Sequence, residues 1–190
     1  MIVRLASFIQ KNSIVDGEGL RAVVWAQGCK HNCPGCHNPE THDMLGGMVF
    51  DVEDIKKQLS ELTYCDGVTF SGGDPMFQPE AFGELAKFVK SLGMNVWCYT
   101  GFEFEKLTKI AQKNKHVDEF LRNIDVLVDG KFKIEERSLN LYFRGSKNQR
   151  IIDVKKSLML NQTCEIEKYK IEKPVSKYDR LANESCGLFC

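Results

Sequence analysis

Apolar residues follow two alternating patterns along this chain, and together these patterns predict an α/β fold. Short apolar runs typical of buried strands cover residues 20–27, 67–70, 94–99 and 124–128. Between these runs, apolar residues recur at steps of three and four, which predicts helices over residues 51–62, 79–92 and 104–112. Strands that alternate with helices of this length form βαβ units, whose strands are parallel.

Residues suited to helix ends support two of these helices. Asp51 is a suitable N-cap for the first helix, because its carboxylate can accept from a backbone N–H of the first turn. Pro79 fits the first position of the second helix, and Gly93 fits the position just after its last turn.

The number of units limits the architecture. A chain of 190 residues suits one domain, but it has too few βα units for a closed eight-fold barrel of about 250 residues. We therefore expect an open, partial (βα) barrel with a mostly parallel sheet over residues 1–160. Beyond about residue 152 the alternation fades, and we expect residues 161–190 to form a weakly structured C-terminal extension.

The overall charge excludes some classes of partner. Lys plus Arg and Asp plus Glu number 26 each, so no global field would hold nucleic acid or an anionic membrane. The first residues lack the long apolar core of a signal peptide, and no stretch approaches the roughly 18 apolar residues of a membrane span. We expect a cytoplasmic protein with neither nucleic acid nor membrane as a partner.

Three cysteines lie close together in a CxxxCxxC arrangement, at Cys29, Cys33 and Cys36. Disulfides are disfavoured in the reducing compartment expected here. Thiolates are soft ligands suited to zinc or to iron–sulfur clusters. His31 or His37 could complete a zinc tetrahedron, but structural zinc usually takes two short ligand pairs, and this loop has no second pair. In a four-iron cluster, three thiolates would leave one iron without a protein ligand.

The residues around these cysteines resemble a known family. Ser13-Ile-Val-Asp-Gly-Glu-Gly-Leu-Arg21 and the stretch from Cys29 to Thr41 resemble the radical S-adenosylmethionine activases of glycyl-radical enzymes. The superfamily usually has an aromatic residue before the third cysteine. Here that residue is Gly35, which is similar to the activators of anaerobic (class III) ribonucleotide reductase.

The resemblance implies one 4Fe–4S cluster held by the three cysteines, with S-adenosylmethionine on the fourth iron. It also implies reductive cleavage of S-adenosylmethionine to a 5′-deoxyadenosyl radical, which abstracts hydrogen from a glycine Cα of a partner. The implied partners are the large glycyl-radical subunit and an electron donor such as flavodoxin or ferredoxin.

A glycine-rich turn follows the predicted strand at 67–70. Its residues are Ser71, Gly72, Gly73, Asp74 and Pro75. The glycines let a ligand approach the backbone, the carbonyls at the strand end can accept from an ammonium group, and Asp74 adds a negative charge. An ordinary turn has the same composition. In the family that the chain resembles, this place holds the amine-binding motif.

Further candidates follow two later strands. Thr100 ends one of them, and Asp129 and Lys131 follow the other. A lysine can hold a carboxylate as a point charge, and an aspartate can accept from ribose hydroxyls or bind a cation. The resemblance implies that Lys131 meets the cofactor carboxylate and that Asp129 lies near the ribose, whereas a solvated turn is the alternative.

Residues 143–153 are similar to a segment near the C-terminal end of the reductase activators. Their polar side chains could bind the adenine, the cofactor carboxylate or the partner backbone; they are Arg144, Asn148, Gln149 and Arg150. Cys65 and Cys98 fall in or beside apolar strands and are expected to be buried. We interpret Cys164, Cys186 and Cys190 as free thiols rather than a second metal site.

The predicted function is activation of anaerobic ribonucleoside-triphosphate reductase. Three alternatives stay open from the sequence: an activase of the pyruvate formate-lyase type, a small-molecule radical enzyme, and a zinc or thiol binding module.

Overall fold

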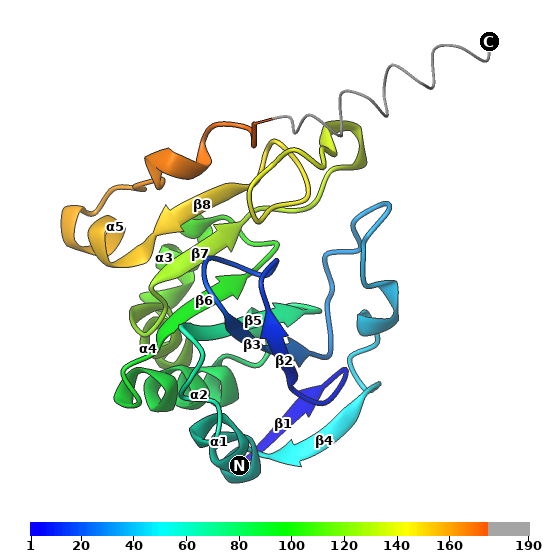
Figure 1. Cartoon of the computed structure of the whole chain (residues 1–190), viewed down its shortest axis with the longest axis vertical. Coiled ribbons are helices and arrows are strands. Elements are labelled where there is room, and N and C mark those ends of the chain that lie inside the picture. Colours follow the sequence, from blue (N-terminus) through cyan, green and yellow to red (C-terminus); the bar gives the residue numbers. More distant parts are fainter. Residues whose placement is uncertain (175–190) are drawn as a thin grey trace.

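A mixed sheet of eight strands organises residues 1–174, which are the residues that the computed structural model describes (Figure 1). The order across the sheet is β4 (Met48–Asp51), β1 (Ile2–Leu5), β3 (Arg21–Ala26), β5 (Gly67–Gly72), β6 (Asn95–Tyr99), β7 (Val126–Asp129) and β8 (Arg150–Asp153). The eighth strand, β2 (Gln10–Ser13), pairs with β3 beside this path.

The centre of the sheet is parallel and its margins are antiparallel. Parallel pairing joins β3 to β5, β5 to β6 and β6 to β7. The outer strands β1, β2, β4 and β8 all pair antiparallel. The predicted α/β class and the parallel centre are confirmed, whereas the antiparallel margins were not predicted. The closure of this sheet into a partial barrel stays a prediction.

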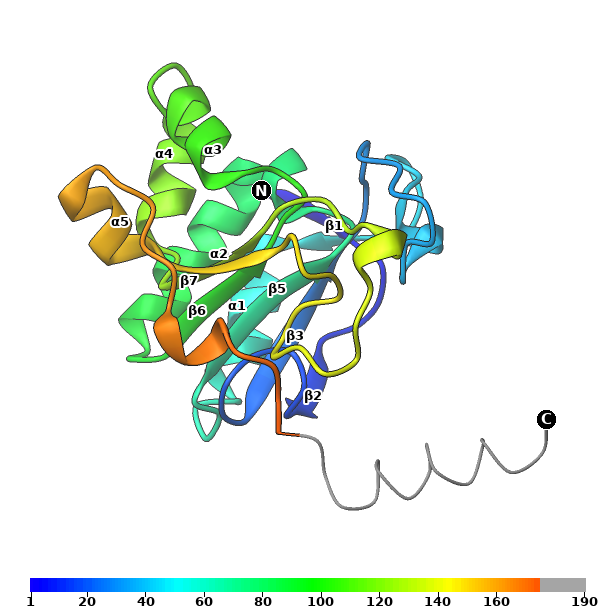
Figure 2. The same ribbon diagram turned by 90° about the horizontal axis from the view of Figure 1, so that it is seen from above.

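Helices cover one face of the sheet. They are α1 (Val52–Ser60), α2 (Pro79–Ser91), α3 (Phe104–Ala111), α4 (Lys115–Arg122) and α5 (Val154–Leu160). Figure 2 shows α1–α4 gathered on one side, while the long connections 27–47 and 130–149 lie toward the other. None of the helices in residues 1–174 combines the length and the apolarity needed to cross a membrane.

Caps and a continuous core explain why these helices form here. The side chain of Asp51 accepts from the backbone N–H of Glu53, and Pro79 is the first residue of α2, both as predicted. Phe70 of β5 packs edge-on against Phe82 of α2 and also contacts Phe120 of α4. This aromatic contact binds the helical layer to the central strands.

The described part of the predicted C-terminal extension packs on the sheet. Tyr169 is only 4% exposed and contacts Trp97 of β6, while Glu165 forms a β-bridge with Ile152 of β8. Tyr169 therefore belongs to the core, whereas residues 170–174 are exposed. The predicted boundary at residue 160 stays a prediction. Cys186 and Cys190 lie outside the described residues.

Candidate functional site

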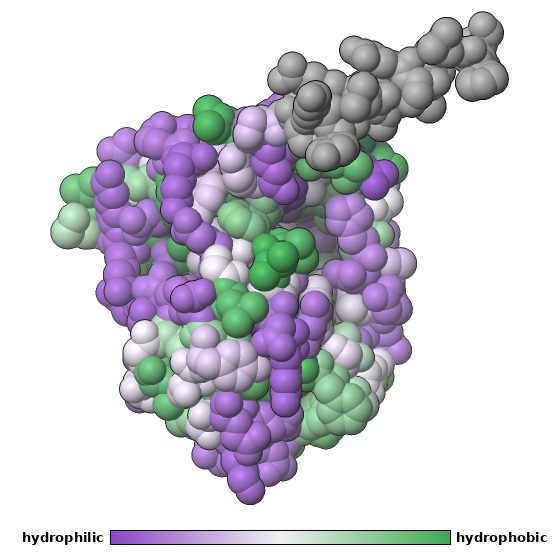
Figure 3. Space-filling view, in the orientation of Figure 1, coloured by the Kyte–Doolittle hydropathy of each residue, from purple (hydrophilic) through white to green (hydrophobic). Residues whose placement is uncertain are grey.

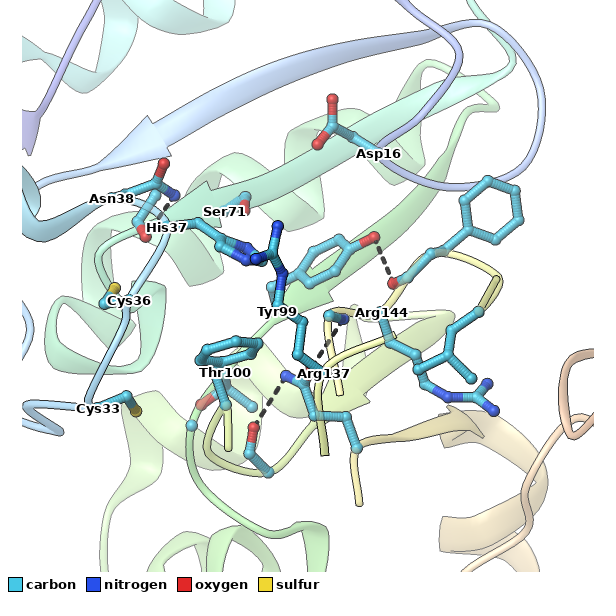
Figure 4. Close-up of a pocket in the computed structure, with 18 of the residues that line it drawn as sticks. Asp16, Cys33, Cys36, His37, Asn38, Ser71, Tyr99, Thr100, Arg137 and Arg144 are labelled. Atoms are coloured by element: carbon cyan, nitrogen blue, oxygen red, sulfur yellow. Dashed lines mark hydrogen bonds between the residues drawn. The ribbon is translucent and has the colours of Figure 1, made fainter. Parts of the chain in front are cut away.

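A cavity of about 540 Å³ opens where the parallel strands β5 and β6 end (Figure 4). It brings together eight of the predicted site residues: Cys29, Cys33, Cys36, Ser71, Gly72, Gly73, Thr100 and Arg144. These residues come from four separate stretches of the chain, and the ends of parallel strands meet at one edge of a sheet. The structure therefore brings these eight residues to one cavity, and their roles in binding stay predictions.

Backbone hydrogen bonds hold the cysteine loop against the glycine-rich turn. The backbone N–H of Asp74 donates to the carbonyl of Gly28 over 3.0 Å, and the N–H of Gly28 donates to Thr41 over 2.8 Å. A Cβ at Gly73 would lie 2.6 Å from the Gly28 oxygen, so only glycine permits this approach. The loop that carries the cysteines is thus held directly against the end of β5.

The three thiols face one cavity without converging on one point. All three are partly buried and free, and no group of three His, Cys, Asp or Glu side chains in residues 1–174 could hold a single metal ion. A zinc ion needs ligands about 2.3 Å away, whereas a four-iron cluster spreads its thiolates around a larger body. A donor set of three thiols fits a cluster better than a single zinc ion.

Burial affects the chemistry of these thiols. It raises the pKa of Cys29 to about 11 and also raises the pKa of Cys33. An unliganded Cys29 therefore carries its proton at neutral pH, and cluster binding has to release that proton.

The structure turns Asp74 away from the cavity. Its carboxylate is 1% exposed, and one oxygen lies 2.7 Å from Nε2 of His31 while accepting from the Thr100 hydroxyl and the Gly101 N–H. Its other oxygen accepts from the backbone N–H of Met76. All of these contacts are within the protein, and residues 71–73 line the cavity whereas Asp74 does not. Pro75 is also buried and does not line the cavity.

His31 anchors the cysteine loop, a role that sequence reasoning missed. Its ring bonds to Asp74 and contacts both Phe77 and Phe102, with centroid distances of 5.5 and 4.6 Å. A Cβ at Gly101 would stand 2.4 Å from the ring, so this glycine leaves the space that the histidine fills. The spacing of the cysteines holds no signal for this contact, because the partners lie about 45 and 70 residues away.

Asp129 and Lys131 lie outside the cavity lined by the cysteines. Asp129 is 1% exposed and accepts from the Phe104 N–H and from the guanidinium of Arg150. The Nζ of Lys131 lies 3.5 Å from the carbonyl of His31 and borders a second cavity. The predicted contacts of both residues with S-adenosylmethionine stay predictions. In this structure neither side chain reaches the cavity that the cysteines line.

Two arginines border the first cavity in different ways. Arg144 bends away from its centre, and its guanidinium donates to the carbonyl of Tyr169 (Figure 4). The exposed Arg137 instead reaches between His37 and Tyr99. It makes no ion pair with any carboxylate of residues 1–174. The sequence did not single out Arg137, because nothing in its polar loop distinguishes it from a surface charge.

Exposed apolar side chains border the mouth of the same cavity. Val15 and Leu139 both line it and are 70% and 80% exposed. Figure 3 shows hydrophobic residues gathered over the loop that follows β2, beside a hollow in this face. Exposed apolar residues around an opening are typical of a surface that contacts another molecule.

Comparison with known proteins agrees with this site. Residues 15–152 match the family described as "4Fe-4S single cluster domain", so the class is that of an α/β iron–sulfur protein. The chain is 34% identical over 143 residues to the anaerobic ribonucleoside-triphosphate reductase-activating protein of Enterobacteria phage T4, across 72% of this chain and 86% of the relative.

Bacterial relatives extend this result. The chain is 34% identical to the protein of the same name from Salmonella typhimurium, across 72% of this chain and 90% of that one. It is also 35% identical to the pyruvate formate-lyase-activating enzyme of Clostridium pasteurianum, across 70% of this chain and 57% of that enzyme. The chain belongs to the family of anaerobic ribonucleoside-triphosphate reductase-activating proteins. The prediction of a radical S-adenosylmethionine enzyme is thereby confirmed.

Proposed function

We propose that this protein activates an anaerobic ribonucleoside-triphosphate reductase by generating a glycyl radical on its large subunit. One observation carries the proposal: three free thiols and the glycine-rich end of β5 face a single open cavity of about 540 Å³. The relatives named as activating proteins of this reductase support the choice of partner.

In this proposal Cys29, Cys33 and Cys36 hold a 4Fe–4S cluster. When bound, the cluster and S-adenosylmethionine supply one electron and a 5′-deoxyadenosyl radical that takes hydrogen from the partner glycine. The loop contacts of Gly28 and His31 hold the thiols in place for this group.

The cavity offers complementary groups for the amino acid part of S-adenosylmethionine. Backbone carbonyls at residues 71–73 would accept from its ammonium group. Gly72, with φ of +100°, lets this turn lie close to β3, because a Cβ there would stand 2.6 Å from the Ala26 oxygen. The guanidinium of Arg137, which pairs with no carboxylate of residues 1–174, suits the carboxylate of S-adenosylmethionine. Lys131 remains the alternative carboxylate partner and would have to move its side chain from the second cavity.

The mouth of the cavity suits a protein substrate. A glycine within a flexible segment can enter an open cavity, and Val15 and Leu139 provide apolar contacts beside it. An activase of the pyruvate formate-lyase type uses the same chemistry and is the second candidate, supported by the Clostridium relative. Cytoplasmic location stays a prediction.

The decisive experiment is anaerobic electron paramagnetic resonance. Reconstituted protein, dithionite, S-adenosylmethionine and the large reductase subunit should together yield a doublet glycyl-radical signal, and Cys33→Ala should abolish it. Pyruvate formate-lyase in place of the reductase serves as the control partner. Formation of 5′-deoxyadenosine without a radical on the reductase would show that the partner is wrong, and a colourless protein without iron would refute the proposal.

A further inference from the structure

A second cavity, of about 590 Å³, lies beside the cysteine loop and is strongly basic. Its lining includes five cationic residues and two anionic ones: Lys30, Lys106, Lys131, Lys133 and Arg150 against Glu103 and Asp129. The chain as a whole has no net charge, so positive charge is concentrated here. Such concentration produces a local field that attracts anionic partners.

Three of these cations have no carboxylate partner within residues 1–174. Lys133 pairs with Glu136, and Arg150 pairs with Asp129 and Glu105. Within the described chain, the exposed ammonium groups of Lys30, Lys106 and Lys131 have no carboxylate within 4.0 Å. Among residues 1–174, the ammonium group of Lys131 bonds only to the carbonyl of His31, and that of Lys106 lies over the ring of Phe102 at 5.5 Å. The free charges are therefore available to a visiting molecule.

The second cavity shares a wall with the first. His31, Gly101 and Gly130 line both, and His31 belongs to the loop that carries the cysteines. Lys30 directly follows Cys29 in the same loop. A molecule seated on the basic cavity would lie against the cysteine loop without entering the cavity that holds the glycine-rich turn.

We propose that this basic face, defined by Lys30, Lys106 and Lys131, docks an acidic one-electron carrier protein. The inference rests on the proposed function, in which each cleavage consumes one electron from outside. The carrier is oxidised by one electron and the cluster is reduced by one. Because electron transfer slows steeply with distance, the carrier has to bind close to the cysteine loop. Unpaired lysines beside that loop provide both attraction and position.

Lys30→Glu/Lys106→Glu tests the inference. Stopped-flow absorbance should follow reduction of the oxidised cluster by reduced flavodoxin at low ionic strength. We expect the rate to fall roughly tenfold or more, because charge steering of this kind changes association rates by about 10 to 10³. The wild-type rate should fall as salt is added, and the variant should lose most of that dependence. Reduction by dithionite should be unchanged.

Lys57→Glu/Lys87→Glu is the matched control. It makes the same charge change at exposed lysines of α1 and α2 that line neither cavity. It should leave the flavodoxin rate within about twofold of wild type. If the double variant fails to load its cluster, the same flavodoxin measurement is made on Lys106→Glu alone. Lys106 lies on α3, away from the cysteines.

Each outcome separates the two proposals. Equal flavodoxin rates in wild type and variant would overturn the docking surface. So would tight binding of ATP or inorganic phosphate to wild type at physiological salt that the variant loses, because the cavity would then be a small-anion site. If the dithionite-reduced wild type makes no glycyl radical on the reductase, the proposed function is refuted instead. The docking test is independent of this result, because reduction of the cluster is measured without the reductase.

Discussion

The carboxylate of Asp74 joins three segments that carry site residues. It contacts His31 of the cysteine loop, Thr100 and Gly101 after β6, and the backbone of its own turn at Met76. A buried carboxylate whose oxygens are all bonded is costly to replace, because its donors are then left unsatisfied. Asp74 therefore positions the site and does not itself face the cavity.

Asp74→Ala should destabilise the apoprotein by roughly 2 to 3 kcal/mol, since it leaves several buried donors without an acceptor. Iron bound per chain after reconstitution should also fall, because His31 loses its anchor. Urea unfolding and iron analysis measure the two effects. The control is Glu40→Gln, which alters an exposed carboxylate of the cysteine loop. It should change neither the stability nor the iron content. Normal stability of Asp74→Ala with weak binding of S-adenosylmethionine would support the direct amine contact instead.

Arg137→Ala should weaken binding of S-adenosylmethionine by roughly tenfold or more, the loss expected for one hydrogen bond between charged groups. Isothermal titration of the cluster-loaded protein gives the dissociation constant. Lys131→Ala is the matched comparison, since it removes the other candidate cation. A larger loss in Lys131→Ala would assign the carboxylate to Lys131, as the family resemblance implies.

At the scale of elements, Arg150 ties three of them together. From the start of β8 it bonds Asp129 at the end of β7 and Glu105 in the first turn of α3. Hydrogen bonds from Arg150 lower the pKa of Glu105 from its ordinary 4.5 to about 2. The contact fixes the edge of the sheet against the helical layer.

Glu105→Gln should lower the melting temperature of the apoprotein slightly at pH 7. The half-exposed carboxylate contributes at most about 1 kcal/mol. Its folded pKa is depressed, so this stability is fully present above pH 4.5 and is lost as the pH falls toward 2. The difference in melting temperature between wild type and variant should therefore shrink below pH 4.5. A difference that stays constant from pH 7 to pH 3 would contradict the ion pair.

The elements that the sequence predicted share a physical feature. The central strands and α1–α3 have long apolar runs or clear helical periodicity because they are buried on both faces or on one continuous stripe. The strands β1, β2, β4 and β8 have four residues each and were not predicted. β7 is equally short, but the apolar residues of 124–128 extend its pattern beyond the strand. In β2, Gln-Lys-Asn-Ser is mostly exposed, and only pairing with β3 makes it a strand.

The candidate site was predictable to a similar extent. Positions at strand ends could be predicted, because parallel topology brings those ends together. The directions in which the side chains point could not be predicted, because they depend on contact residues that are distant in the sequence. Asp74 turns inward to His31, Asp129 is taken by Arg150, and Arg137 enters from a loop without a recognisable pattern.

At the scale of the whole molecule, the C-terminal segment completes the edge of the site. Tyr169 packs against Trp97 and Phe143, and its hydroxyl donates to Glu18 in the loop that follows β2. Lys168 bonds the same carboxylate and lowers the pKa of Glu18. The loop 14–19, which borders the cavity through Val15 and Asp16, is thereby joined to residues 150 positions away in the chain.

Tyr169→Ala should destabilise the apoprotein by about 3 kcal/mol, as expected for a buried aromatic side chain truncated to alanine. Tyr169→Phe keeps the packing and removes only the hydroxyl bond to Glu18, so it should cost about 1 kcal/mol. Urea unfolding gives both values. Limited proteolysis should cleave the loop 14–19 faster in the alanine variant, because the loop loses the bond from Tyr169 to Glu18. If both variants unfold like wild type, residues 165–174 do not pack on the domain in solution.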